Sequence, residues 1–144
     1  MVHHKALGKG VTRPTRLTLT GGTLTHDAVF SAVKETKAVM TFSSGRTELD
    51  FVDSYAHNIA AYRLAELIGL DAMIPMTVER EYEHERGSLV WWVDAKMDEG
   101  DRRTQKLSAP DREDWDRQMS RVRVFTQLIA DTDRNTGNLL IDAD

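Results

Sequence analysis

The chain has 144 residues, of which 40% are hydrophobic and 29% charged, with a formal net charge of −4. This length suits one globular domain, and the sequence has neither a basic tract typical of nucleic-acid binding nor the roughly 20 apolar residues of a membrane-spanning helix. The absence of cysteine excludes disulfides, thiolate catalysis and cysteine-ligated zinc. Because the N-terminus also lacks the apolar core of a secretory signal, we expect a cytoplasmic protein.

The first expected element is a β-hairpin. Residues 15–20 (TRLTLT) alternate polar and apolar side chains, Gly21 and Gly22 follow, and residues 23–33 form a second β-rich run. Two consecutive glycines accept the positive φ angles of a tight hairpin turn. Residues 34–50, which contain SSGR, are interpreted as a loop.

A helix is expected from about residue 54 to residue 68. Ser54 or the preceding aspartate can cap its N-terminus and Gly69 its C-terminus, and apolar residues recur along it at helical spacing. A second hairpin should follow, with residues 76–82 (MTVEREY) and 88–93 (SLVWWV) as its strands and EHERG as its turn.

The strongest pattern is a second helix, from about residue 111 to residue 130, along which apolar residues recur at intervals of three and four. The charged segment before it, residues 97–111, is interpreted as a linker. A loop over residues 131–138 and a short strand over residues 138–141 (NLLI) come next. Strands, helix, strands, long helix, loop and strand in this order predict an α+β fold.

The loop after the long helix has part of the spacing of a calcium site. An EF-hand-type loop takes oxygen ligands at positions 1, 3, 5 and 12, and these positions hold Asp131, Asp133, Asn135 and Asp142. Position 6, where the sharp turn requires glycine, is a threonine, and position 8, which is usually apolar, is Asn138. A calcium-binding loop is therefore the weakest of three interpretations.

The same loop places an aspartate five positions before an asparagine, directly ahead of an apolar strand. Phosphotransferases use this spacing because the aspartate orients the attacking hydroxyl while the asparagine holds a magnesium ion on the nucleotide phosphates. Asp133 and Asn138 fit the spacing, and Arg134 adds a guanidinium that can stabilise phosphate charge. The third interpretation is structural: Asp133 and Asn138 only brace a turn.

These residues resemble a known group of proteins. Residues 131–141, DTDRNTGNLLI, resemble the catalytic loop of the atypical kinase-like families that include lipid kinases and HipA-like kinases. The blocks GKGVTRP, HDAVF, FVDSYAHNIAAYRLAELIGL and GSLVWWV, in this order, are similar to a bacterial group of kinase-like proteins of uncharacterised function. The resemblance covers about residues 7–141. It implies a protein-kinase-like fold, with a small β-rich lobe over residues 1–96 and the start of a helical lobe over residues 97–144.

The resemblance also implies cofactors and site residues. ATP and Mg²⁺ would be bound, Asp133 and Arg134 would be catalytic, and Asn138 would be a metal ligand. The backbone N–H groups of a glycine-containing loop would lie near the phosphates, and the residues of that loop are Gly8, Lys9 and Gly10.

Three departures from the kinase pattern are visible. Ser31 stands near the place of the strand lysine that contacts the phosphates, and Asn58 stands where a helix glutamate would pair with that lysine. The second metal-binding aspartate, expected after the strand that follows the catalytic loop, is missing from these 144 residues. We therefore expect an incomplete ATP-dependent phosphotransferase domain acting on an unknown phosphate acceptor. The alternative is a non-catalytic kinase-like binding module.

Overall fold

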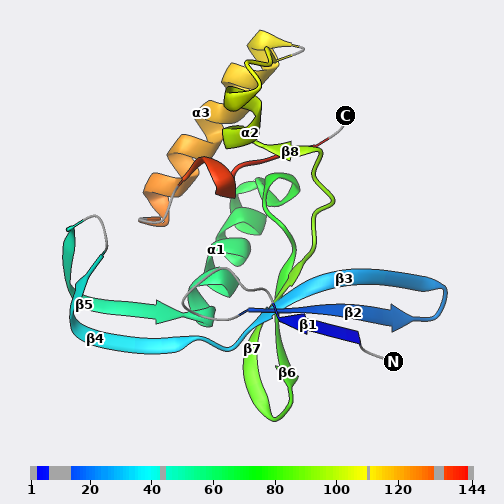
Figure 1. Ribbon diagram of the computed structural model, residues 1–144, viewed down its shortest axis with the longest axis vertical. Helices are drawn as coiled ribbons and strands as arrows, with labels where there is room; N and C mark the ends of the chain where they lie inside the picture. The colour runs from blue at the N-terminus through cyan, green and yellow to red at the C-terminus, as the bar shows by residue number, and fades with distance from the viewer. Residues whose placement is uncertain (1–2, 7–13, 43–44, 110, 132–134, 143–144) are drawn as a thin grey trace. The chain divides into compact units, whose positions relative to one another are not determined.

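The computed structural model describes residues 3–6, 14–42, 45–109, 111–131 and 135–142. The fold is α+β, with antiparallel sheets and three α-helices (Figure 1). The chain divides into two compact units, Met1–Trp92 and Val93–Asp144. Within the described residues, no helix combines the length and the apolar character that crossing a membrane requires.

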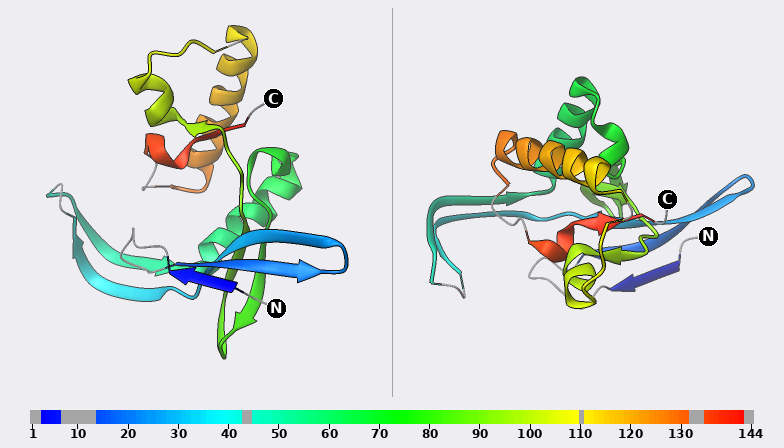
Figure 2. Two further views of the ribbon diagram at one scale, coloured as in Figure 1. Left: turned by 45° about the vertical axis from the view of Figure 1, so that its right-hand side comes forward. Right: turned by 90° about the horizontal axis from the view of Figure 1, so that it is seen from above.

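The first unit is built on a five-stranded antiparallel sheet, in the order β1-β2-β3-β7-β6. Its strands are β1 (His3–Ala6), β2 (Thr15–Gly21), β3 (Leu24–Ser31), β7 (Glu85–Trp91) and β6 (Thr77–Tyr82). The two further views in Figure 2 show the long β2–β3 hairpin extending from this sheet.

Both expected hairpins are confirmed, but their turns are not where the sequence placed them. Gly21 is still part of β2 and pairs with Leu24, so the first turn lies one residue later, with Gly22 at a φ of 60°. In the second hairpin the turn is the pair Glu83 and His84, at φ angles of 52° and 67°. Two residues with positive φ give a tight turn whose twist matches that of the strands.

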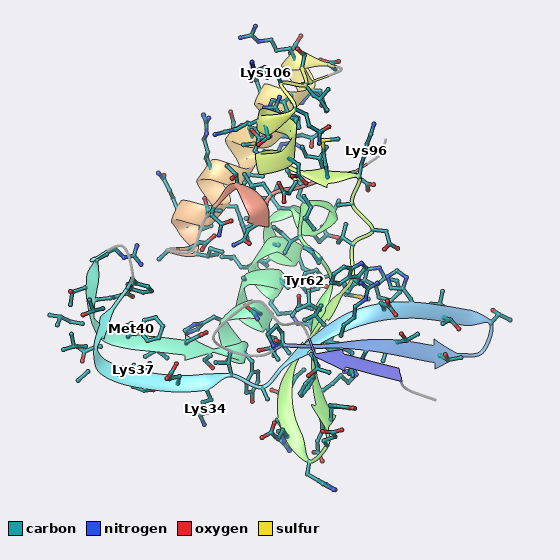
Figure 3. The ribbon with its side chains drawn as sticks, in the orientation of Figure 1. Lys34, Lys37, Met40, Tyr62, Lys96 and Lys106 are labelled. Carbon is teal, nitrogen blue, oxygen red and sulfur yellow. The ribbon has the colours of Figure 1, made fainter. Side chains whose placement is uncertain are left out.

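The prediction of a loop over residues 34–50 is wrong. This region forms β4 (Lys34–Thr41) and β5 (Thr47–Ser54), which pair as a separate two-stranded sheet. Lys34, Lys37 and Met40 project from β4 (Figure 3). Alternation of charged and apolar residues is compatible with a solvated hairpin. The Phe42 N–H donates to the Arg46 carbonyl and the Gly45 N–H to the Phe42 carbonyl, both at 2.9 Å, so the connection between the two strands is short.

Helix α1 (Tyr55–Ile68) confirms the expected helix and both of its caps. The Ser54 hydroxyl accepts a hydrogen bond from the Ala56 N–H, and Gly69 ends the helix at a φ of 72°. The helix packs against β6 and β7, and Tyr62 projects from it into the interior (Figure 3). Among the described residues of this unit, the buried apolar side chains are Leu17, Ala28, Phe30, Tyr62 and Ala65.

The second unit contains β8 (Met97–Asp98), α2 (Glu99–Thr104), α3 (Arg112–Leu128), the 3-10 helix η2 (Thr136–Asn138) and β9 (Leu140–Ile141). The long helix is confirmed as α3. The prediction of a linker over residues 97–111 is wrong for the first half of this segment, which forms β8 and α2. The expected strand at 138–141 begins only at Leu140, because Asn138 ends η2. Strands β8 and β9 pair antiparallel.

Candidate functional site

The residues predicted to act in phosphate transfer are described only in part. Asp133, Arg134 and the loop residues Gly8, Lys9 and Gly10 lie outside the described residues. Asn138 is described: it is the last residue of η2, its side chain is exposed, and its N–H donates to the Asn135 carbonyl at 3.2 Å. The expectation that the side chains of Asp133 and Asn138 lie close together therefore stays a prediction, because Asp133 is not among the described residues.

Main-chain hydrogen bonds hold the segment around Asn138 in place. The Glu99 N–H donates to the Leu139 carbonyl and the Lys96 N–H to the Ile141 carbonyl, both at 2.9 Å. At the start of η2, the Asn135 side-chain oxygen accepts a hydrogen bond from the Gly137 N–H at 2.9 Å. The position of Asn138 is thus set on one side by a capped 3-10 turn and on the other by the edge of the β8–β9 pair.

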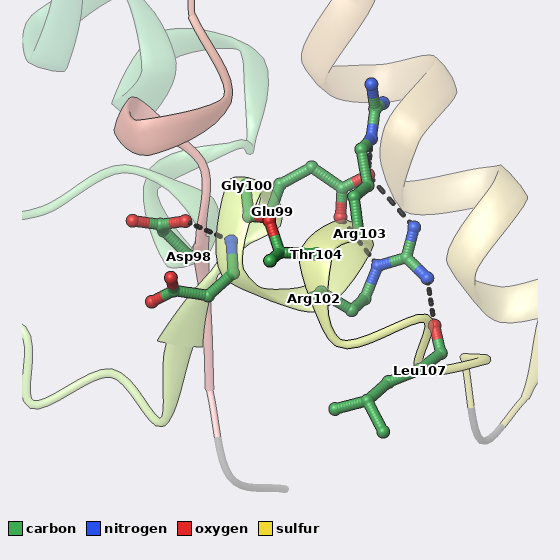
Figure 4. Close-up of polar contacts among 8 residues, drawn as sticks. Asp98, Glu99, Gly100, Arg102, Arg103, Thr104 and Leu107 are labelled. Carbon is green, nitrogen blue, oxygen red and sulfur yellow. Dashed lines mark hydrogen bonds and ion pairs between the residues drawn. The ribbon is translucent and has the colours of Figure 1, made fainter.

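A buried carboxylate with two arginines stabilises α2, directly beside this segment (Figure 4). Glu99 is only 2% exposed. Arg102 donates to both of its oxygens, at 2.6 and 3.0 Å, and Arg103 donates through Nε at 2.7 Å. These contacts, the Arg102 hydrogen bonds foremost, lower the pKa of Glu99 from 4.5 to about 2. The carboxylate is therefore charged across the physiological range.

Arg102 connects this cluster to α3. Its guanidinium also donates to the Leu107 carbonyl and lies over the ring of Trp115, 4.8 Å from the ring centre. A guanidinium over an indole face is favoured by the ring quadrupole. One arginine thus links α2, the chain that follows it and α3, and neither arginine was found from the sequence.

The second unit has an open pocket of about 290 Å³ next to the cluster. It is lined by side chains from α2, from α3 and from the segment that carries Asn138: Arg103, Met119, Arg123, Asn135, Thr136 and Leu139. Among these described residues, two carry positive charge and none carries negative charge. The sequence alone does not reveal this pocket, because its two arginines are 20 positions apart on different helices.

In the first unit, the two positions that depart from the kinase pattern are joined through a third residue. The Asn58 side-chain amide donates to the Ser88 hydroxyl at 3.3 Å, and this hydroxyl donates to the Ser31 carbonyl at 3.5 Å. Ser88 is fully buried. The neighbouring Gly87 permits this approach, since a Cβ there would lie 2.4 Å from the Ser31 carbonyl oxygen. A chain of neutral groups therefore connects β3, β7 and α1.

A second polar cluster lies between β2, β3 and the end of β7. The Asp27 carboxylate accepts hydrogen bonds from the Thr18 hydroxyl at 2.6 Å and from Arg16 at 2.7 Å. These two contacts lower the pKa of Asp27. Arg16 also lies 3.8 Å from the centre of the Trp92 ring, and His26 stacks on Trp91 at 3.7 Å. The cluster is internally paired, which is typical of a structural role.

The described residues contain no group of three or more histidine, aspartate or glutamate side chains placed to hold a metal ion. Asp133, which both the calcium and the magnesium interpretations require, lies outside them. Comparisons with family models, with curated proteins and with solved structures give no match to this chain. Function is therefore inferred from the residues and geometry of the chain.

Proposed function

We propose that this chain is part of a kinase-like, ATP-dependent phosphotransferase. In this proposal Asp133 would accept the proton of the acceptor hydroxyl, Asn138 would hold a magnesium ion that neutralises nucleotide charge, and Arg134 would stabilise phosphate charge. The acceptor oxygen forms a bond to the γ-phosphorus, the bond from that phosphorus to the β–γ bridging oxygen breaks, and ADP leaves.

The observation that carries the proposal is the link between Ser31 and Asn58. In protein kinases the corresponding lysine, on the third strand, pairs with a glutamate on the following helix. The sequence resemblance places Ser31 near the first of these positions and Asn58 at the second. They are 27 residues apart, and the buried Ser88 bonds to both, to the Asn58 side chain and to the main-chain carbonyl of Ser31. The strand and helix positions thus lie on either side of one buried residue, and this proximity is compatible with the strand–helix pairing of a kinase-like lobe and supports the proposal.

The order of elements in the second unit gives further support. Helix α3 leads into the 131–138 segment, and β9 starts two residues after Asn138. An asparagine at an exposed position before a short strand suits a magnesium ligand, because magnesium prefers oxygen donors. Asn138 supplies only one such donor, so the site also requires Asp133.

The alternative, a non-catalytic kinase-like binding module, is favoured by the neutral character of the same chain of contacts. Neither Ser31 nor Asn58 supplies the cation that contacts nucleotide phosphates in kinases, and the Ser88 hydroxyl between them is neutral too. Losing that cation weakens phosphate binding and transition-state stabilisation. A module of this kind would bind its ligand without transferring phosphate.

A thermal-shift titration with ATP and Mg²⁺ tests the proposal. At a ligand concentration of 100 times Kd, binding stabilises the folded protein by about 2.7 kcal/mol, which raises Tm by about 5–10 °C for a chain of this size. Asn138→Ala and Asp133→Ala should reduce this shift, whereas Gln127→Ala, an exposed amide on α3, should not.

Phosphate transfer separates the two candidates. Release of ADP that depends on Asp133 supports the phosphotransferase, and a magnesium-dependent ATP shift without ADP release supports the binding module. Absence of any nucleotide response would refute both nucleotide-binding proposals. A shift with calcium alone would favour the loop formed by Asp131, Asp133, Asn135 and Asp142.

A further inference from the structure

The pocket of the second unit has the lining of an anion site with an apolar wall. Arg103 and Arg123 provide positive charge, Asn135 and Thr136 provide polar groups, and Met119 with Leu139 provides apolar surface. Its volume of about 290 Å³ is near the lower end of small-molecule sites, which span about 300–1,000 Å³. The pocket is therefore suited to a small ligand that carries both an anionic group and a carbon skeleton.

Arg103 is held in position by the buried carboxylate. Its Nε donates to Glu99 at 2.7 Å, and Glu99 is itself fixed by Arg102. Figure 4 shows the terminal nitrogens of Arg103 on the side away from this carboxylate. Because Arg103 is held by one edge of its guanidinium, the terminal nitrogens remain as donors at low entropic cost to a ligand.

Two of the four arginines of α3 form ion pairs. Arg117 pairs with Asp114, and Arg112 approaches Asp116 at 3.9 Å. Among the described residues, the side chains of Arg121 and Arg123 form no hydrogen bond or ion pair, and of these two only Arg123 lines the pocket. It lies one helical turn after Met119, on the same face of α3, so both line the pocket. Arg123 is thus a cation whose counter-charge a ligand can supply.

We propose that this pocket binds a small phosphomonoester, with Arg103 and Arg123 on its phosphate group. Guanidinium groups match the oxygen geometry of phosphate and form charge-assisted hydrogen bonds to it. Met119 and Leu139 then cover the carbon part of the ligand. The proposal does not depend on nucleotide binding, since none of these residues is a catalytic or nucleotide-binding candidate.

Calorimetric titration of the full chain with glycerol 3-phosphate tests this, without nucleotide or magnesium and at constant ionic strength. Because both arginines are partly in contact with water, we expect a Kd of about 1 mM. Arg123→Gln and Arg103→Gln should each weaken binding about tenfold. Arg112→Gln is the matched control: its side chain is 93% exposed and lies outside the pocket, so Kd should not change.

The outcomes are distinguishable. Equal Kd values for the wild type and Arg123→Gln would overturn the proposal, as would the same heat with chloride in place of the phosphoester. Arg123→Gln is the decisive variant, because Arg103→Gln also removes a hydrogen bond from Glu99. Inorganic phosphate that binds as tightly as glycerol 3-phosphate would show that the apolar wall contributes nothing and that free phosphate is the ligand.

Asn138→Ala separates this proposal from the proposed function. It should leave phosphoester binding unchanged while removing the magnesium–ATP response. Phosphoester binding that depends on Arg123 in a protein without any ATP response would support the pocket and refute the nucleotide proposal. If ATP binds and the Kd for glycerol 3-phosphate is the same in the wild type and in Arg123→Gln, the nucleotide proposal is supported and the pocket proposal is refuted.

Discussion

Replacing Glu99 by glutamine should destabilise the second unit in a pH-dependent way. The two arginines lower the pKa of this carboxyl from 4.5 to about 2, a difference worth about 3 kcal/mol at neutral pH. That figure is an upper bound, because the Arg103 side chain is 62% exposed and water screens its charge. We expect Glu99→Gln to lower the free energy of unfolding by about 1–2 kcal/mol at pH 7.

The sign of the pH dependence follows from the direction of the shift. Since the folded protein holds Glu99 at a lower pKa than the unfolded chain does, the carboxylate contributes its full stabilisation above about pH 5. This contribution is lost as the pH falls toward 2, where Glu99 becomes protonated. The stability difference between wild type and Glu99→Gln should therefore shrink over that range. The other acidic groups titrate alike in both proteins, so their contributions cancel in the stability difference.

Urea denaturation followed by NMR measures this stability difference for the second unit alone. Trp115 is the single tryptophan of the second unit, since the other two are Trp91 and Trp92, so its indole N–H signal reports on that unit alone. A unit-specific probe is needed because two units need not unfold together. Glu113→Gln, an exposed glutamate in the first turn of α3, should cost less than about 0.5 kcal/mol. A stability difference that is the same at pH 7 and pH 3 would refute the reasoning.

Three further substitutions have outcomes set by local geometry. Gly87→Ala should destabilise the first unit by about 1–3 kcal/mol in thermal unfolding, because a Cβ would lie 2.4 Å from a carbonyl oxygen of β3. A variant as stable as the wild type would show that β3 and β7 are farther apart. Gly69→Ala should cost about 1–2 kcal/mol, because its φ is 72°, whereas Gly21→Ala, in open surroundings with no positive φ, should cost less. Asp111→Ala should cost about 1 kcal/mol through the lost N-cap of α3, and Asp111→Ser should recover most of it when helix content is followed by circular dichroism.

The elements that the sequence predicted correctly are those with signals inside their own boundaries. Helix α1 has a capping serine at position 54 and a glycine at position 69, and both act as expected. Helix α3 has a repeating apolar pattern over 17 residues. Local propensity and capping act within a few residues, so a single sequence is sufficient to reveal them.

The elements that were missed depend on weaker or longer-range signals. Helix α2 has six residues and little apolar surface, so the charged segment was interpreted as a linker. A signal was present, since Asp98 caps the helix and Glu99 stands three and four positions before two arginines. The link through Ser88 could not be predicted, because it joins residues 30 and 57 positions apart. A contact of this kind is set by strand pairing rather than by local sequence.

The most direct test of the proposed function is to locate the metal. Mn²⁺ bound with ATP broadens NMR signals near the ion, so titration of the full chain with Mn²⁺–ATP reports which side chains lie beside it. We predict strong broadening of the Asn138 side-chain amide and weaker broadening of the Gln127 amide, with recovery of the Asn138 signal when Mg²⁺ displaces Mn²⁺. An Asn138 signal that stays sharp while ATP is bound would contradict the assignment of this residue as a metal ligand.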